Sequence, residues 1–363
     1  MKRLVLLGGG HAHVHCLAAF AADPIGGIQI TLISPYARQV YSGMLPGWIA
    51  GHYAIDECVI SLPPLAARSG TVFQQTSAVA IDPARRSVRC ADGSEHSYDL
   101  LSIDTGPIAD LEHLPGARDH ALVVRPLEEF IEAWAALRSR LRAGRGGHIA
   151  MVGAGAAGVE LALAMRHSLR DLADARFTLV SAANTLPGRT GARLARLMRQ
   201  ARIEILAGTQ AERIGAGRVE LAGGRALEAD AVIVSTGSAA AWLQRSGLAL
   251  DERGFLATGT RLQSLSHPDV FAVGDCASIE DHARPKSGVY AVRAGAPLAD
   301  NLRRALTGLP LLDHLPQNRS LYLISAGGRY AVGSWGGLAW EGAWVWRWKD
   351  RIDRAFIARY AAR

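Results

Sequence analysis

Two glycine-rich turns, one near the start of the chain and one near its middle, constrain the fold more than any other feature. The first, Gly8-Gly9-Gly10, follows the apolar residues 4–7, and the second, Gly153-Ala154-Gly155-Ala156-Ala157-Gly158, follows the apolar residues 149–152. Each turn opens a stretch with helical periodicity. A strand, a Gly-x-Gly turn and a helix together present backbone amides and a positive helix terminus to a pyrophosphate. Two such units predict two dinucleotide sites.

The residues around the two turns repeat at the level of whole elements. Each turn is followed by a helical stretch and then a second apolar run, at residues 28–33 and 177–180. Each half also closes with an apolar run that ends in Thr-Gly, at 100–106 and 231–237. Strands that alternate with helices indicate βαβ units and parallel sheets. Short alternating runs at 87–90 and 218–221 predict hairpin strands, with turns at Asp92-Gly93 and Gly223-Gly224.

A third apolar run, 270–273, ends in Gly274-Asp275 and comes after the second unit. This order predicts that the chain returns to complete its first domain, so that the second is an insertion. The predicted domains are a discontinuous one over 1–118 and 253–320, an inserted one over 119–252 and a C-terminal segment over 321–363.

The composition of the 363 residues fits a folded protein of a reducing compartment. Hydrophobic residues make up 49% and charged residues 20%, and the four cysteines are scattered without a C-x-x-C pair. We therefore expect a cytoplasmic protein without a signal peptide. The net charge of +7 comes from arginines spread along the chain, which does not favour a nucleic-acid surface.

Several motifs resemble those of a known family. These are Gly8-Gly9-Gly10-His11-Ala12-His13-Val14 and the stretches 41–47, 285–293 and 346–354. The chain resembles the FAD-dependent pyridine nucleotide-disulfide oxidoreductases, the group of type II NADH dehydrogenases and sulfide:quinone reductases. A narrower resemblance is to the flavoprotein module fused ahead of selenophosphate synthetase in some organisms. The implied fold class is α/β, with two Rossmann-like dinucleotide-binding domains in a glutathione-reductase-like arrangement and a C-terminal amphipathic helix.

The resemblance assigns the first unit to FAD. The expected contacts are Gly8, Gly10, His11, Ala12, Ser34, Thr105, Gly106, Gly274, Asp275 and Ser287. Two positions depart from the fingerprint, because His13 replaces the third glycine and Ser34-Pro35 stand where an acid is expected. In the family the aspartate at 275 binds the ribityl chain; the alternative is a strand-end cap.

Lys286 is predicted to be a catalytic residue. Reduced flavin develops negative charge, which a nearby cation and a helix N-terminus stabilise. Ser287 would cap the following helix, and the Pro-Lys-Ser-Gly string resembles that of sulfide:quinone reductases. The alternative is a surface lysine.

The resemblance assigns the second unit to NADH or NADPH, with a preference for NADH. The expected contacts are Gly153, Gly155, Ala157, Gly158, Glu160, Thr236 and Gly237. In the family Glu160 lies near the nicotinamide, so it is predicted to be a catalytic residue as well; the alternative is a buried helical glutamate bonded to backbone. Arg189 and Arg193 are candidates for a 2′-phosphate contact.

Histidines and cysteines do not point to metal or sulfide chemistry. His11, His13 and His15 lack accompanying carboxylates, so packing roles are expected and no metal site is predicted. Cys276 has no partner cysteine within its motif, which disfavours disulfide-based sulfide oxidation.

The tail carries Trp348, Ile352, Phe356 and Tyr360 at steps of four, which predicts an apolar helix stripe opposite Lys349, Asp353 and Arg354. This stripe would pack on the body or on a second copy in a homodimer, or it would lie on the inner face of a membrane.

The expected function is transfer of hydride from NAD(P)H to FAD and of electrons onward to a quinone or another small-molecule acceptor. The acceptor itself is not specified by the sequence. The alternatives are an oxidoreductase of sulfur or selenium compounds and a flavin-binding sensor or partner protein without turnover.

Overall fold

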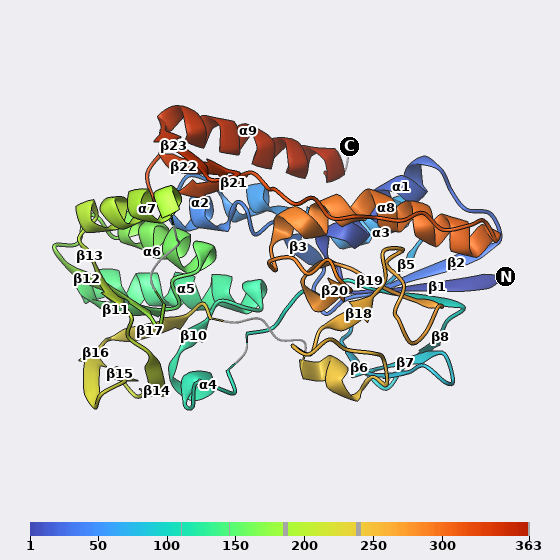
Figure 1. Ribbon diagram of the computed structural model, residues 1–363, viewed down its shortest axis with the longest axis horizontal. Coiled ribbons are helices and arrows are strands. Elements are labelled where there is room, and N and C mark those ends of the chain that lie inside the picture. Colours follow the sequence, from blue (N-terminus) through green and yellow to red (C-terminus); the bar gives the residue numbers. More distant parts are fainter. Residues whose placement is uncertain (110, 145, 184–187, 237–240, 362–363) are drawn as a thin grey trace.

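The computed structural model describes residues 1–109, 111–144, 146–183, 188–236 and 241–361 (Figure 1). Two five-stranded parallel sheets occupy opposite halves of the molecule, and the C-terminal helix runs above the half with the second sheet and ends near the middle (Figure 1). This is the α/β class that the two glycine turns predict.

The first sheet is built around the N-terminal strand. In spatial order its strands are β19 (Val270–Ala272), β9 (Leu100–Ile103), β1 (Lys2–Leu7), β2 (Ile28–Ile33) and β5 (Val72–Gln74). All four pairings are parallel. Because β19 follows the second sheet in sequence, the chain does return to complete its first sheet.

Helices α1 (His11–Ala22) and α8 (Gly288–Thr307) pack against each other beside the first sheet. Their approach is close, since a Cβ on Gly295 would lie 2.7 Å from the Cβ of His15. Leu4, Phe20 and Leu298 belong to the hydrophobic cluster between these helices and the sheet. The turn before α1 is therefore held on a rigid support.

The second sheet has the same parallel design. Its strands in spatial order are β10 (Leu122–Val123), β17 (Ala231–Val234), β11 (Gly146–Val152), β12 (Asp174–Ser181) and β13 (Ile203–Ala207). Its helices are α5 (Leu127–Ala143), α6 (Ala156–Ser168) and α7 (Gly188–Gln200). The domain boundaries given above stay predictions.

Two antiparallel three-stranded sheets accompany the parallel ones. They are β6 (Ala78–Asp82), β7 (Ser87–Cys90) and β8 (Glu95–Ser97), and β14 (Ala211–Gly215), β15 (Arg218–Leu221) and β16 (Arg225–Glu228). The strands predicted at 87–90 and 218–221, and the turns at Asp92-Gly93 and Gly223-Gly224, are confirmed.

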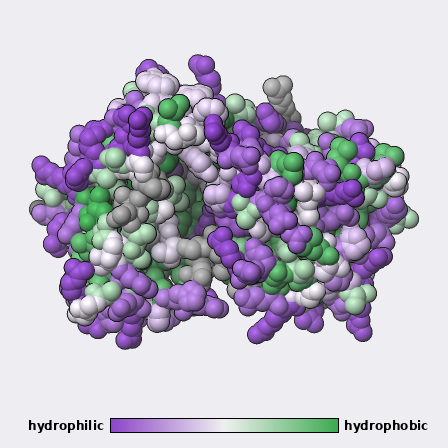
Figure 2. Space-filling view, in the orientation of Figure 1, coloured by the Kyte–Doolittle hydropathy of each residue, from purple (hydrophilic) through white to green (hydrophobic). Residues whose placement is uncertain are grey.

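Short elements fill the connections. They are β3 (Arg38–Val40), α2 (Leu45–Ile49), η1 (Ile55–Cys58), β4 (Val59–Ser61), α3 (Leu62–Arg68), α4 (Ala117–His120), η2 (Ala241–Arg245), β18 (Leu256–Thr258), η3 (Gly274–Cys276) and β20 (Ala277–Ile279). Hydrophilic side chains cover most of the face in Figure 2, and hydrophobic residues form small patches between them.

The C-terminal segment is a sheet followed by a helix. Its elements are β21 (Tyr322–Ser325), β22 (Ala331–Trp335), β23 (Leu338–Gly342) and α9 (Ala343–Tyr360). The helix was predicted, but the orientation of its faces was wrong. Phe356 and Tyr360 are buried together with Lys349 and Asp353, whereas Trp348 and Ile352 are 39% and 41% exposed. Residues four apart advance by more than one 3.6-residue turn, so a stripe built on that step drifts around the helix.

Candidate functional site

A cavity of about 360 Å³ opens at the carboxyl ends of β1, β2 and β9. Ligands of open parallel sheets bind at this end of the strands. Predicted FAD contacts in its wall are Gly8, Gly10, His11, Ser34, Thr105, Gly106 and Asp275. The wall also contains Gln39, whose Oε1 is buried without a hydrogen-bond partner in the described structure. Space and an unused polar atom at this position fit a bound coenzyme.

Asp104 is a residue of this wall that the sequence analysis did not single out. Its Oδ2 accepts hydrogen bonds from the backbone amides of Ala12 (2.8 Å) and His13 (3.1 Å) at the start of α1. The predicted contact Ala12 therefore already has a partner for its amide. The signal available in the sequence was a carboxylate directly after an apolar strand and before Thr105-Gly106.

The three histidines of α1 have packing contacts. His13 is fully buried, with Nδ1 2.6 Å from the carbonyl oxygen of Gly8 and Nε2 2.8 Å from Oγ of Ser102. His15 Nδ1 lies 3.0 Å from the hydroxyl of Tyr360. Burial lowers the pKa of both His11 and His13 to about 4, so these rings are neutral at pH 7.

The acidic residue at the edge of the cavity beyond β2 comes from α5 and not from the chain directly after β2. Ser34 Oγ donates to the carbonyl oxygen of Tyr36 within its own turn. Glu128, in the first turn of α5, lines the cavity and accepts hydrogen bonds from Arg38 on both carboxylate oxygens. The sequence has no acid directly after β2, and the acid at this edge of the cavity is Glu128, whose partner Arg38 lies 90 positions earlier in the chain.

Asp275 lines both the main cavity and a smaller one, and Lys286 lines only the smaller one. Asp275 borders the main cavity, where its Oδ2 is 3.6 Å from Arg125. Lys286 borders a smaller cavity of about 60 Å³, together with Gly274 and Asp275. Its Nζ donates to the carbonyl oxygen of Ala277 and lies 4.0 Å from the ring centroid of Phe255. Burial lowers the pKa of Lys286 and raises that of Asp275.

Ser287 is the N-cap residue of α8, but its side chain makes no capping hydrogen bond.

The second glycine turn has the geometry of the complete fingerprint. Gly153 adopts φ +111°, a Cβ on Gly158 would lie 2.0 Å from the carbonyl oxygen of Gly153, and a Cβ on Gly155 would meet nothing within 4 Å. The third glycine thus permits close packing of α6 on the turn, and the second leaves open space for a ligand. Ala157 follows in the first turn of α6, and Ser235-Thr236 come directly after the neighbouring strand β17. Gly237 lies outside the described residues.

Glu160 points from α6 toward the C-terminal sheet. Its Oε1 accepts a hydrogen bond of 2.7 Å from the backbone amide of Ser325. Burial raises its pKa, and the charge of Lys349 opposes that shift. Arg193 forms an ion pair of 3.1 Å with Glu341, so one of the two candidate 2′-phosphate ligands is already engaged.

Comparison with known proteins identifies the family. Residues 2–295 match the model of the pyridine nucleotide-disulphide oxidoreductases. The chain belongs to this family. FAD and a nicotinamide nucleotide are the cofactors for which its two dinucleotide units are built.

Individual relatives are more distant. The chain is 32% identical over 270 residues to the nitric oxide reductase FlRd-NAD(+) reductase of Aeromonas hydrophila. The matched region is 69% of this chain and 64% of the relative, so the chain spans less than two thirds of the length of the relative. Identity to the alternative NAD(P)H-ubiquinone oxidoreductase C1 of Arabidopsis thaliana is 25%, over 87% of this chain and 70% of the relative. The sulfide:quinone oxidoreductase of Aquifex aeolicus has the same fold, with a TM-score of 0.82, 18% identity and coverage of 99% and 91%.

The pyridine nucleotide-disulphide oxidoreductase described here has its four cysteines free and buried. Burial raises the pKa of the Cys276 thiol to about 12, so it is protonated at neutral pH. A buried thiol is a poor nucleophile. The structure therefore gives no support to cysteine-based sulfide chemistry.

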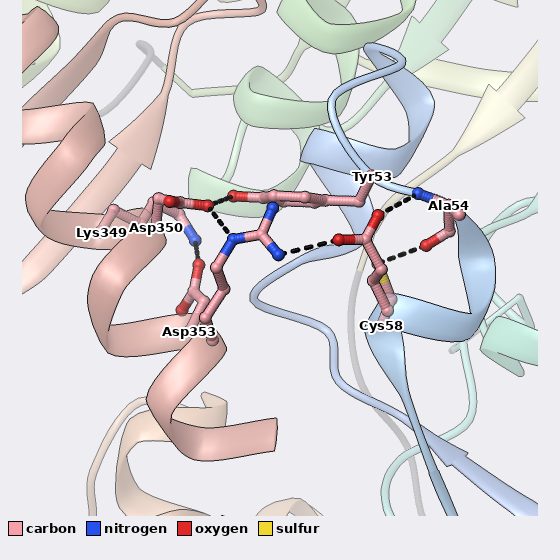
Figure 3. A network of polar contacts seen from close by, with 8 residues as sticks. Tyr53, Ala54, Cys58, Lys349, Asp350 and Asp353 are labelled. Carbon is pink, nitrogen blue, oxygen red and sulfur yellow. Dashed lines mark hydrogen bonds and ion pairs between the residues drawn. The ribbon is translucent and has the colours of Figure 1, made fainter. Parts of the chain in front are cut away.

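A polar network joins the C-terminal helix to the chain between β3 and η1, and Figure 3 shows its contacts with the segment Tyr53 to Cys58. Lys349 Nζ lies 2.6 Å from Asp353 and 2.5 Å from the carbonyl oxygen of Gly43, and both side chains are buried. Tyr53 donates to Asp350 at 2.7 Å. Phe356 stacks on Tyr41 at 4.4 Å between ring centroids. These contacts hold residues 41–53 against the C-terminal helix, and Ser42 of that stretch lines the cavity. Periodicity did not predict that the charged Lys349 and Asp353 would lie on the buried face of the helix.

Proposed function

We propose that this chain takes a hydride from NADH or NADPH onto FAD and passes the electrons to a quinone or another small redox acceptor. The observation that carries the proposal is the shared wall of the main cavity. The first glycine turn borders it on one side, and Arg125 and Glu128, which lead into the second unit, border it on another. A ligand there would lie at the junction of the two dinucleotide units.

The residues of the chain would bind and orient the two coenzymes, because hydride transfer between them needs no protein acid or base. FAD, when bound, supplies the two-electron chemistry. The residues Gly8–His11 would hold its pyrophosphate, and Gln39 would bond a polar group of the coenzyme. Asp275 would bind its ribityl chain, with Arg125 holding the carboxylate in place.

The roles of Lys286 and Glu160 form part of the proposal. The Lys286 cation is next to Asp275 and precedes the N-terminus of α8, so both would favour negative charge on the reduced flavin. Glu160, Gly153, Gly155, Ala157, Gly158, Thr236 and Gly237 would contact the nicotinamide nucleotide. The likeness to a module fused to selenophosphate synthetase rests on sequence motifs alone, and a selenium compound as acceptor is a variant of this proposal.

Spectroscopy of the purified protein tests the function directly. We expect a flavin absorbance spectrum that bleaches within seconds when NADH is added without oxygen, and faster than with NADPH. A panel of quinones and small sulfur and selenium compounds would then identify the acceptor by reoxidation. A flavin that stays oxidised with both nucleotides would contradict the proposal and favour a sensor.

The exposed aromatic surface, formed by Trp335, Leu338, Trp344, Trp348 and Ile352, supports a second proposal on location. Each of these side chains is at least 39% exposed, and Arg347 and Arg351 are exposed on the same helix. No helix in the described ranges is both long and apolar enough to cross a membrane. We propose that this surface lies on the anionic inner face of a membrane, because tryptophans and arginines suit that interface.

Sedimentation with vesicles tests the location. Binding to phosphatidylglycerol vesicles should be lost in the double variant Trp344→Ser with Trp348→Ser and kept in Leu315→Ser, which alters an exposed leucine outside the surface. Concentration-dependent dimerisation without vesicle binding would instead assign the surface to a second copy of the chain.

A further inference from the structure

The carboxyl group of Asp104 occupies part of the place where the first glycine turn is expected to hold a phosphate. Its Oδ2 takes the amides of Ala12 and His13, the first two after the start of α1, and the side chain is only 2% exposed. The hydrogen bonds described for this carboxyl all fall on Oδ2. An anion is therefore already built into the helix terminus that borders the cavity.

Glycines make the room that this carboxyl needs. A Cβ on Gly10 would lie 2.2 Å from the Cγ of Asp104, and one on Gly274 would lie 2.6 Å from its Oδ1. Gly274 and Gly10 come from opposite ends of the first unit in sequence. The turn is thus shaped around Asp104 as much as around a ligand.

The second unit shows that the fold does not require a charge at this position. Ser235 follows β17 as Asp104 follows β9. A Cβ on Gly153 would lie 2.5 Å from the carbonyl oxygen of Ser235, as one on Gly8 would lie 2.4 Å from that of Asp104. The two positions are structurally equivalent, and only the first carries a carboxylate.

The groups that face Asp104 do not neutralise it. They are His13 and Cys16 from α1 and Asp275 and Cys276 from η3. Both thiols are protonated at neutral pH, His13 is neutral, and Arg125, which lines the same cavity, pairs with Asp275. Burial and Asp275 raise the pKa of Asp104 to about 7, although its two amide hydrogen bonds oppose the shift.

We propose that FAD binds to this site together with one proton, which is held on Oδ1 of Asp104, so that retention of the coenzyme depends on pH. The pyrophosphate brings two negative charges to amides next to those that Asp104 uses, and an ionised Asp104 would repel them. The carboxylate, one solvent proton and FAD give the complex with a neutral carboxyl, and no electron moves. This inference rests on the proposed function in taking FAD as the ligand.

The size of the effect follows from linkage. At pH 6 Asp104 is mostly protonated before FAD binds, whereas at pH 8.5 the proton must be taken up. The FAD dissociation constant should therefore be about thirtyfold larger at pH 8.5 than at pH 6. Asp104→Asn keeps an oxygen acceptor for the two amides and removes the charge. Its dissociation constant should change less than about twofold over the same range.

Calorimetry of FAD added to the deflavinated chain, at pH 8 in two buffers of different ionisation enthalpy, counts the protons taken up. We expect nearly one for the wild type, none for Asp104→Asn, and nearly one for the control Asp99→Asn. Asp99 is an exposed aspartate at the opposite end of β9, bonded to the amide of Arg3. Asp104→Ser, which installs the residue of the second unit, provides a second variant if Asp104→Asn does not fold.

The possible outcomes separate the two proposals. FAD binding without proton uptake in the wild type would overturn the role of Asp104 and leave the proposed function intact. Absence of FAD binding at pH 6 and at pH 8.5 would overturn the proposed function itself. An Asp104→Asn protein that still takes up a proton would show that another group, such as Asp275, carries it.

Discussion

The two glycine turns of this chain perform the same structural task with different residues. In the second unit Gly158 lets α6 approach the turn, the space beside Gly155 is open, and Ser235 follows the adjacent strand β17. In the first unit His13 stands at the position of Gly158, and Asp104 at that of Ser235. The first turn is therefore closed by side chains of the protein: the His13 ring is hydrogen-bonded to the carbonyl oxygen of Gly8, and the Asp104 carboxylate accepts from the amide of Ala12 at the start of α1. A shared motif thus fixes the backbone path, while the charge offered to a ligand differs between the units.

The largest effect is expected where the second turn is tightest. In Gly158→Ala the new Cβ would lie 2.0 Å from a backbone oxygen, so strand and helix must separate. We expect a loss of about 3 kcal/mol in the free energy of unfolding, measured in urea, and loss of flavin reduction by NADH. Gly155→Ala is the matched control, since its Cβ meets nothing. Gly155→Ala should have the stability of the wild type and a higher KM for NADH. Equal losses of stability in both variants would contradict the different roles assigned to the two glycines.

His13→Gly completes the fingerprint of the first turn and tests whether the fingerprint matters there. The change removes the two contacts of the imidazole, to Gly8 and Ser102, and puts a glycine inside α1. We expect a loss of roughly 2 to 3 kcal/mol in unfolding free energy, slightly less than for Gly158→Ala, and no gain in FAD affinity. Tighter FAD binding in this variant would contradict this expectation. It would show that His13 weakens FAD binding relative to the glycine of the fingerprint, instead of stabilising the turn.

Asp104→Asn removes the carboxyl group that distinguishes the first unit from the second, and its effect is expected in the pH dependence of the free energy of unfolding. The pKa of Asp104 is raised from 3.8 to about 7 in the folded chain, so its protonated form stabilises the fold below pH 4 and that contribution is lost as the pH rises to 7. Both proteins are compared without flavin. Between pH 5 and pH 7 the free energy of unfolding of the variant should rise by about 2 kcal/mol relative to that of the wild type. Urea unfolding at the two pH values measures this gain. A constant difference would mean that Asp104 titrates normally.

Much of this architecture could be predicted because it follows from local patterns. Apolar strands, glycine turns and the Thr-Gly endings are contiguous in sequence, and they located both sheets and the return of β19. The contacts of Asp104 could not be predicted in this way, because they depend on which strand end meets which helix. The same holds for Glu128, which reaches the cavity from α5, and for the ion pair of Lys349 with Asp353, which periodicity assigned to solvent. The contacts of Asp104 and Glu128 depend on long-range pairing. Lys349 and Asp353 are only four residues apart, and the long-range contacts there are those with Gly43 and Tyr41.

The smallest expected effect concerns Lys286, whose cation faces the smaller cavity and the ring of Phe255. Its charge should still stabilise reduced flavin across Asp275, because electrostatic attraction acts beyond direct contact in a poorly solvated site. Lys286→Met should lower the two-electron potential of the flavin by about 30 mV and slow its reduction by NADH. Lys2→Met removes the same charge at the far end of β1, where Lys2 bonds the carbonyl oxygen of Leu306, and should leave the potential unchanged. Equal potentials in all three proteins would assign flavin tuning to the N-terminus of α8 alone and confine Lys286 to its bond with Ala277.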